Sequence, residues 1–408
     1  MLPPRCTLRH PAGGLLRVAT QLSPPVDAPP EAGNILPRLI HRPNHTACLE
    51  EPFHDDDQAL RSGCTSGSPK MIPSGRRLVL AGALAAPFIP TARAEPVKMR
   101  VSLDTAPGHA RTVSIADFLK KLEAASQGEI APHLYDSGEL LADHAVIKAL
   151  VLGQIEMAAP GTWLVSAYVP EADLGQLPVF YGQPVSVTHA ATDGIPGDLV
   201  NEQIARKLRV TIPGHWIDLG YFNWYSSRKP LASLDDLRGL RIRNSGGFAQ
   251  PWRARFFGAV PTETDWPDVP AALAQGVFDA LQSTNESCAS ARLWDAGLRY
   301  ALIDHQAMGA YIPMISETFW TALRPALKTL ITDLWAANIG VYRANMAAAQ
   351  DKAEKDLRAR GMKLTVVPPE DLVEARRRMM AEQDQVVREM RISPAIFARI
   401  TESVTAIN

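Results

Sequence analysis

The chain has 408 residues, of which 46% are apolar, and a formal net charge of −1. A chain of this length and composition can bury a full hydrophobic core, and its length favours two or three domains. The near-neutral charge argues against a nucleic-acid partner, because binding to phosphates favours a basic surface. We therefore expect a globular protein that does not bind nucleic acid.

The first feature in chain order is a predicted signal peptide. Residues 1–70 show neither helical nor strand periodicity, and Met71 opens a different pattern. A pair of arginines precedes a short apolar run over 78–89, which is followed by small residues around 92–94. A basic segment, a short apolar segment and a small-residue cleavage site in this order are typical of a signal peptide. The apolar run is too short for a permanent membrane span.

We interpret residues 71–94 as this signal peptide, with translation starting near its first residue and cleavage before Glu95. Residues 1–70 are then either a segment upstream of the true start or a disordered extension. The arginine pair at 76 and 77 fits a twin-arginine signal as well as an ordinary secretory signal. Either export route predicts a periplasmic protein.

The predicted mature chain opens with alternating strands and helices. Strand-like alternation runs over 97–103, and helical spacing of apolar residues runs over 112–125. The pattern then predicts a strand at 130–135, a helix at 142–152 and a short buried strand at 155–159. This order indicates a mainly parallel sheet with helices on its faces.

A second α/β unit is predicted from about residue 220 onward. It contains a strand at 240–243, a helix at 248–257, a helix around 270–274 and a strand at 277–281. Two such units predict a two-lobed α/β fold with a cleft between the lobes, where ligands commonly bind.

Long helices are predicted toward the C-terminus. One covers 316–360, with Pro325 either early in it or kinking it, and a charged helix covers 370–390. We expect lobe I to comprise 95–219 with about 308–345. We expect lobe II to comprise 220–307 with about 346–408.

Motifs for cofactors, metals and catalysis are absent from the sequence. The cysteines at 6, 48, 64 and 288 have no metal-site spacing, and the six histidines after residue 95 are isolated. No GxGxxG, Walker, GxSxG or HExxH pattern occurs. We therefore predict no cofactor, no metal and no catalytic residues. An enzyme that acts on a carboxylated metabolite is the alternative, because catalytic pairs also form between residues that are distant in sequence.

Several segments resemble, in the same order, the solute-binding proteins of TRAP transporters, of the DctP type. Residues 235–243, DDLRGLRIR, resemble the family's DLKGLKIR segment. The other similar segments are GEL at 138–140, GQIEM at 153–157, LPVF at 177–180, GAVP at 258–261 and the ALAQGVFD region within 266–279. The resemblance covers about residues 97–350. It implies a two-lobed periplasmic receptor of the periplasmic-binding-protein fold, type II-like, whose lobes close on a small organic carboxylate. The resemblance also implies that the receptor hands its ligand to a membrane permease.

The resemblance implies that Arg243 clamps the substrate carboxylate. Its planar guanidinium presents two parallel donors that match two carboxylate oxygens. The alternative is an exposed charge at a strand end. Trp266 matches the family's pocket aromatic, and Ser283 falls where relatives carry a polar side chain that hydrogen-bonds the ligand. Ordinary packing is the alternative for both residues.

Further pocket residues are expected on the same basis. Asp104 follows the first strand, and Thr162 and Trp163 follow the third, in segments that line the pocket in relatives. Phe222, followed by Asn223, occupies the register where many relatives carry a second arginine. This difference predicts a ligand with one carboxylate and, opposite the acidic Asp104, a cationic or hydrogen-bond-donating group.

Two questions about partners stay open at this stage. A sensor that signals to a membrane kinase would show the same sequence features as a transport receptor. The helix predicted over 316–360 would also serve as a homodimer contact, although a monomeric receptor fits equally well.

Cleavage before Glu95 is testable by intact mass. The exported protein, isolated from the periplasm, is expected to begin at Glu95, because this residue follows the small-residue cleavage site. A mature chain that begins well before Glu95 would contradict the assignment.

Overall fold

The structure is a computed structural model that describes residues 95–406. The predicted signal peptide at 71–94, the segment 1–70 and three of the four cysteines lie outside the described residues. Cys288 is buried and forms no disulfide within the described residues. Within the described part of the chain, no helix is long and apolar enough to cross a membrane.

The first of two main sheets has the strand order β2-β1-β3-β12-β4. β1 pairs in parallel with β2 and β3, while β12 is antiparallel to both β3 and β4. The mainly parallel sheet predicted for this unit is present, with one antiparallel strand that arrives from much later in the chain. The strands are β1 (Val97–Ser102), β2 (Ile130–Tyr135), β3 (Met157–Ala158), β4 (Val210–Thr211) and β12 (Met314–Ser316).

Helices accompany this sheet, beginning with α1 (Ala110–Ala125). The predicted stripe of Ile115, Phe118, Leu119 and Leu122 is buried on α1, because residues three and four apart share one helical face. The other elements are α2 (Asp143–Val151), α3 (Thr162–Val165), η1 (Pro170–Gln176), η2 (Pro178–Phe180), α4 (Val185–Thr192) and α5 (Ile195–Leu208).

The second main sheet has the order β13-β10-β6-β9-β7-β8. β7 is parallel to β8 and β9, and β10 is parallel to β13, whereas β6 is antiparallel to both of its neighbours. The strand predicted at 277–281 begins later, because Gly276 to Asp279 form the turn that leads into it. The strands are β6 (Asn223–Ser226), β7 (Arg241–Asn244), β8 (Val260–Glu263), β9 (Ala280–Ser283), β10 (Tyr300–Ile303) and β13 (Lys363–Val366). The helices are η3 (Leu234–Leu237), α6 (Ala249–Phe256), η4 (Trp266–Asp268), α7 (Val269–Ala274) and α8 (Asn285–Ser290).

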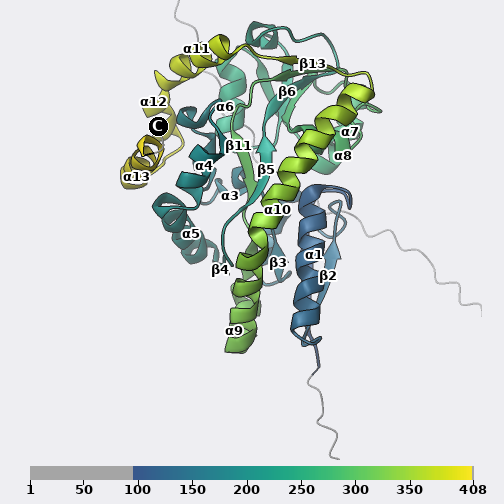
Figure 1. Cartoon of the computed structure of the whole chain (residues 1–408), viewed down its shortest axis with the longest axis vertical. Coiled ribbons are helices and arrows are strands. Elements are labelled where there is room, and N and C mark those ends of the chain that lie inside the picture. The colour runs from purple at the N-terminus through teal and green to yellow at the C-terminus, as the bar shows by residue number, and fades with distance from the viewer. Residues whose placement is uncertain (1–94, 407–408) are drawn as a thin grey trace, which may run out of the picture. The chain divides into compact units, whose positions relative to one another are not determined.

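Two features connect the two sheet units. β5 (Ile217–Tyr221) and β11 (Met308–Tyr311) form an antiparallel ribbon of their own. The helix α10 (Pro325–Ala359) contacts α1 of the first unit, the ribbon strand β5, and α8 of the second unit (Figure 1). One continuous helix therefore touches both units, so any movement between them has to be accommodated along it.

The helix predicted over 316–360, with Pro325 early in it or kinking it, is in fact two helices. α9 (Glu317–Ala322) ends before Leu323 and Arg324, which are extended, and Pro325 is the first residue of α10. Proline has no backbone N–H and disfavours helical geometry at the preceding residue, so it starts a helix well but interrupts a continuous one.

The charged segment predicted as one helix over 370–390 is likewise divided. It forms α11 (Pro369–Met380) and α12 (Gln383–Glu389), and α13 (Pro394–Thr405) follows them. α13 packs against α4 and α5 of the first sheet unit. The lobe boundaries given by sequence remain a prediction.

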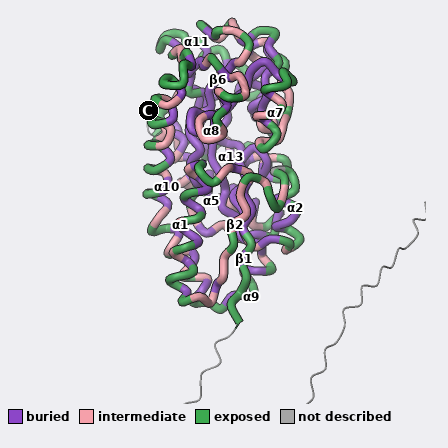
Figure 2. Tube along the Cα trace, turned by 90° about the vertical axis from the view of Figure 1, so that its right-hand side faces the viewer, coloured by how far each residue is buried: buried purple, intermediate pink, exposed green. Residues whose placement is uncertain are grey.

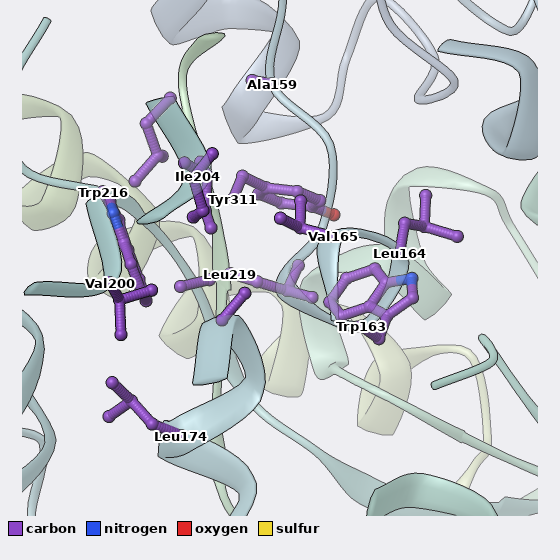
Figure 3. Close-up of a cluster of buried hydrophobic side chains, with 14 of the residues drawn as sticks. Ala159, Trp163, Leu164, Val165, Leu174, Val200, Ile204, Trp216, Leu219 and Tyr311 are labelled. Atoms are coloured by element: carbon purple, nitrogen blue, oxygen red, sulfur yellow. The ribbon is translucent and has the colours of Figure 1, made fainter. Parts of the chain in front are cut away.

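The core is apolar and continuous over most of the described chain. Buried residues run through its interior, while α1 and α10 alternate between buried and exposed residues along their length (Figure 2). Around β5, side chains from α3, α5 and β11 gather into one cluster that includes Trp163, Leu219 and Tyr311 (Figure 3). This cluster forms one wall of the site described below.

Trp335 is expected to contribute strongly to stability. It is fully buried on α10, its ring centroid lies 5.1 Å from that of Phe118, and its Nε1 donates to the carbonyl of His215 at 3.0 Å. Trp335→Ala should lower the free energy of unfolding by about 3–5 kcal/mol, measured by urea denaturation. Trp320→Ala, at a partly buried position on α9, is the matched control and should cost clearly less. Equal losses in the two variants would contradict this packing.

Candidate ligand-binding site

A small cavity, here called the inner cavity, is lined by both sheet units and by the ribbon between them. Its free volume is about 20 Å³, enough for about one water molecule, so an organic ligand enters only if the walls move apart. Its lining comprises Asp104, Trp163, Leu219, Phe222, Arg243, Ser245, Trp266, Ser283, Ser287 and Tyr311.

Strand geometry explains why these residues meet. Asp104 lies two residues past the end of β1, and Arg243 and Ser283 lie toward the C-terminal ends of β7 and β9. β7 and β9 are parallel neighbours, so their C-terminal ends lie at the same edge of the sheet. That edge is where α/β folds commonly place ligands.

Arg243 places a guanidinium in the wall of the inner cavity. The residue is 1% exposed, which excludes the alternative of a solvent-facing charge at a strand end. Its Nε and one terminal nitrogen donate to the carbonyl of Thr264 at 2.9 and 2.6 Å, and the other terminal nitrogen donates to Ser245 Oγ at 2.9 Å. Its Cζ lies 5.4 Å from the ring centroid of Trp266. These contacts fix the plane of the guanidinium, as recognition of a carboxylate by two parallel donors requires.

A second buried arginine, Arg111, lies on the first turn of α1. It is 1% exposed and forms an ion pair with Asp104. Its guanidinium also donates to the carbonyl of Ala159 at 3.0 Å and stacks over Tyr311, with Cζ 3.9 Å from the ring centroid. A second small cavity, lined by Arg111 and Ala159 among others, shares Asp104, Trp163 and Tyr311 with the inner cavity. The charge of Asp104 is therefore balanced from within the chain.

Trp163 forms the aromatic centre of the site. Its ring centroid lies 5.7 Å from those of both Phe222 and Tyr311, in edge-to-face contact with each. Trp163, Leu219 and Tyr311 come from α3, β5 and β11 and lie together in Figure 3. A Cβ added at Gly161 would lie 2.3 Å from the indole, so only glycine permits this placement of the ring.

The walls of the inner cavity from the two units are joined by direct contacts. His109, which caps α1, lies with its Nε2 2.8 Å from Glu286 Oε2, and the Ala110 amide donates to the other oxygen of Glu286 at 3.0 Å. On α2, His144 Nε2 lies 2.8 Å from Asp265 Oδ1. These contacts run between the first and second units and hold the walls together.

Six of the eight residues predicted for the site line the inner cavity. These are Asp104, Trp163, Phe222, Arg243, Trp266 and Ser283. Their roles toward a ligand remain predictions. Two are placed elsewhere, because neighbours in the chain face different ways. Thr162 donates to Asp173 at 3.0 Å, and Asn223 Oδ1 accepts from the amides of Asp304 and His305 at 3.1 and 2.9 Å.

Other residues that line the inner cavity were not predicted from the sequence. Leu219, Ser245, Ser287 and Tyr311 have no distinguishing local pattern, and the topology alone brings them to the cavity. Arg111 had a weak signal in the sequence. A positive charge in the first turn of a helix is unfavourable unless an acidic partner is near, so the position of this arginine indicated such a partner. Among residues 95–406, no group of three or more potential ligands is arranged to hold a metal ion.

Comparison with known proteins identifies the family. Residues 102–390 match the model of the DctP family, described as bacterial extracellular solute-binding protein, family 7. The chain belongs to this family. The resemblance seen in the sequence is thereby confirmed, and the match covers both sheet units and the residues of the inner cavity.

Individual relatives of this DctP-family chain agree. The C4-dicarboxylate-binding periplasmic protein DctP of Rhodobacter capsulatus is 25% identical over 283 residues, which cover 69% of this chain and 83% of the relative. The sugar acid binding protein of Advenella mimigardefordensis, solved with galactonate, superposes with a TM-score of 0.72 at 18% identity over 77% of this chain and 99% of its own. A TRAP solute-binding protein of Sulfurospirillum deleyianum, solved with succinate, gives 0.69 at 19% identity over 75% and 98%. The two-lobed fold is therefore that of the TRAP solute-binding proteins.

A buried polar network adjoins the site behind Asn223. Asp304 accepts hydrogen bonds from Tyr181 and Trp224 at 2.7 and 2.8 Å, and burial raises its pKa to about 7 against these hydrogen bonds and the charge of Arg253. The folded protein therefore holds a proton on Asp304 at pH values where an ordinary aspartate, with a pKa near 3.8, has released it.

The stability of the protein is expected to depend on pH through Asp304. Because its pKa is raised by folding, the free energy of unfolding should fall as pH rises from about 4 to about 7. Asp304→Asn keeps an acceptor for both hydrogen bonds but carries no titrating proton, so the fall between pH 5 and pH 8 should shrink. Urea denaturation at the two pH values measures it, with the exposed Asp333→Asn as control. An unchanged pH dependence in Asp304→Asn would refute the assignment.

Proposed function

We propose that this chain is the periplasmic receptor of a TRAP transporter, which captures a small organic carboxylate with Arg243 and delivers it to a membrane permease. The observation that carries the proposal is a buried guanidinium in the wall of a cavity that both units line. Three of the relatives and neighbours are named for, or were solved with, a dicarboxylate or a sugar acid. A carboxylate is thus the ligand chemistry that the guanidinium and the family have in common.

Binding would couple to closure of the lobes. A carboxylate seated on Arg243 would contact side chains of both units, including Trp163 from the first and Trp266 from the second. A ligand that binds the closed arrangement more tightly than the open one shifts the equilibrium between them toward the closed arrangement. The size of the shift is set by the difference between the two affinities. The closed form would be the one that the permease recognises.

The proposal makes the protein a carrier rather than an enzyme. The characterised relatives named above bind solutes, and the residues of the inner cavity offer a clamp and apolar walls for retention. Turnover of a bound carboxylate would contradict the assignment as a carrier.

A sensor would use the same site as a transport receptor. Genes for the two membrane subunits beside the gene for this protein would favour transport. Homodimerisation through α9 and α10 stays a prediction.

Arg243 is the residue whose loss tests the proposal. Arg243→Ala should weaken binding of any carboxylate ligand by about 30-fold or more, because truncating one partner of a buried charge pair costs at least about 2 kcal/mol. Arg243→Lys keeps the charge but loses the two parallel donors, so it should bind with intermediate affinity.

Calorimetry with a panel of organic acids, after removal of any bound ligand by unfolding and refolding, measures the effect. Arg206→Ala, at an exposed arginine on α5, is the control and should bind as wild type. Circular dichroism confirms that each variant is folded. An acid that binds Arg243→Ala as tightly as wild type would overturn the clamp.

A further inference from the structure

We propose that a small cavity beside the inner cavity is a subsite for a single oxygen atom, held between the indole N–H of Trp163 and the hydroxyl of Ser102. This cavity, here called the side cavity, is the one that shares Asp104, Trp163 and Tyr311 with the inner cavity. The inference gives Trp163 a hydrogen-bonding role in addition to its apolar one. Where the oxygen belongs to the ligand, the inference rests on the proposed function and narrows the ligand class.

Two polar groups in the walls of the side cavity are buried without a hydrogen bond. Ser102 is 1% exposed and Trp163 is 6% exposed, and both residues line this cavity. Within the described part of the chain, neither Ser102 Oγ nor Trp163 Nε1 has a hydrogen-bond partner. A buried hydroxyl or N–H that gives up water and gains no partner costs free energy. Two such groups at one cavity therefore point to a guest that bonds both of them.

The indole nitrogen lies at the side cavity, although Trp163 borders two other cavities as well. The Cε2 and Cζ2 atoms, at the edge of the ring that carries Nε1, face Gly161. Gly161 lines the side cavity, but it lines neither the inner cavity nor the larger one, of about 400 Å³, beside His144. In Figure 3 the nitrogen lies on the side of the ring toward Leu164, which also lines the side cavity.

The indole ring is held in place on several sides. Phe222 and Tyr311 contact it edge to face, with ring centroids 5.7 Å away in each case. The backbone of Gly161 closes a further side, and a glycine has no side chain that could move away. Since the ring has little freedom to turn toward another acceptor, a partner for Nε1 has to come to the ring.

The size and the chemistry of the side cavity select an oxygen atom. Its free volume is about 10 Å³, which is near the lower limit for one water-sized group. An oxygen accepts a hydrogen bond from the indole N–H and forms a second one with the Ser102 hydroxyl, which both donates and accepts. An ammonium group only donates, so it would leave Nε1 unpaired. Asp104 and Arg111 also line the cavity and are engaged in their ion pair and in further interactions.

The oxygen can come from two sources that share this chemistry. A carboxylate ligand anchored at Arg243 can place a hydroxyl group in the side cavity, because Trp163 lines both cavities. An ordered water molecule can take the same place and hold the indole, which is a wall of the inner cavity. The two sources are distinguished by whether the hydroxyl of a ligand raises its affinity.

The ligand source is tested by calorimetry on the exported, ligand-free protein. The probes are two pairs of acids that differ by one hydroxyl, lactate with propionate and 3-hydroxybutyrate with butyrate. If the ligand supplies the oxygen, the hydroxy acid of at least one pair should bind about tenfold or more tighter, because a site built to bond a hydroxyl rejects the analogue without it.

Trp163→Phe removes the N–H and keeps an aromatic ring, so this ratio should fall about fivefold or more. Trp266→Phe makes the same chemical change at the other tryptophan of the inner cavity, and it should change both affinities together and leave their ratio as in wild type. A preference for the hydroxy acid that survives Trp163→Phe, or that falls equally in Trp266→Phe, would overturn the inference.

Ser102→Ala decides the case in which no hydroxy acid is preferred or no acid binds. A water molecule in the side cavity loses one of its hydrogen bonds in this variant, so the melting temperature of the ligand-free protein should fall by about 2 °C or more. Ser316→Ala is the matched control, because Ser316 is equally buried on β12, its Oγ also has no partner among the described residues, and it does not line the side cavity. Removing an unpaired hydroxyl should leave the melting temperature unchanged or raise it. An unchanged or raised value in Ser102→Ala, or an equal fall in both variants, would refute the subsite.

The subsite and the receptor function fail separately. If an acid binds through Arg243 but neither test supports the subsite, the subsite falls and the receptor function stands. If no acid binds in a manner that depends on Arg243 while Ser102→Ala alone lowers the melting temperature, the clamp falls and the subsite stands as a water site.

Discussion

The site depends on a positive charge that is buried inside the protein and held in a fixed orientation. A guanidinium removed from water needs acceptors for its N–H groups, and Arg243 donates some of these to a backbone carbonyl and a hydroxyl, while its face lies toward the ring of Trp266. The carbonyl belongs to Thr264, just after β8, which is the parallel neighbour of the strand that carries Arg243. The sheet that produces the cavity edge thus also supplies the partner that orients the charge.

The helix α10 connects the elements that carry the inner cavity to one another. It packs on α1, whose first turn carries Arg111, and on α8, which contributes Ser287 to the inner cavity. The two walls of the site are therefore supported by one element of secondary structure. A long helix bends gently at small cost, so it can connect two bodies that change their angle while preserving the contacts within each of them.

Much of this arrangement could be read from the sequence. Alternation in β1 and the apolar stripe of α1 follow from local periodicity, and the parallel pairing follows from their order in the chain. The family resemblance pointed to Arg243 and to the five other predicted residues that line the inner cavity. Tyr311 and Leu219 could not be predicted from the sequence. They enter the site through the ribbon of β5 and β11, two strands that are almost a hundred residues apart in the chain. The break before Pro325 and the division of the charged C-terminal segment were misjudged, since helical periodicity continues across both interruptions.

Gly161 carries a consequence for how such a receptor diversifies. The indole of Trp163 occupies the space where a side chain at 161 would begin, and the same indole borders the inner cavity, its neighbour and a larger cavity nearer the surface. A single added methyl group would displace a ring that three separate hollows share. A change at residue 161 would therefore reshape the inner cavity while leaving the Arg243 side chain itself unchanged.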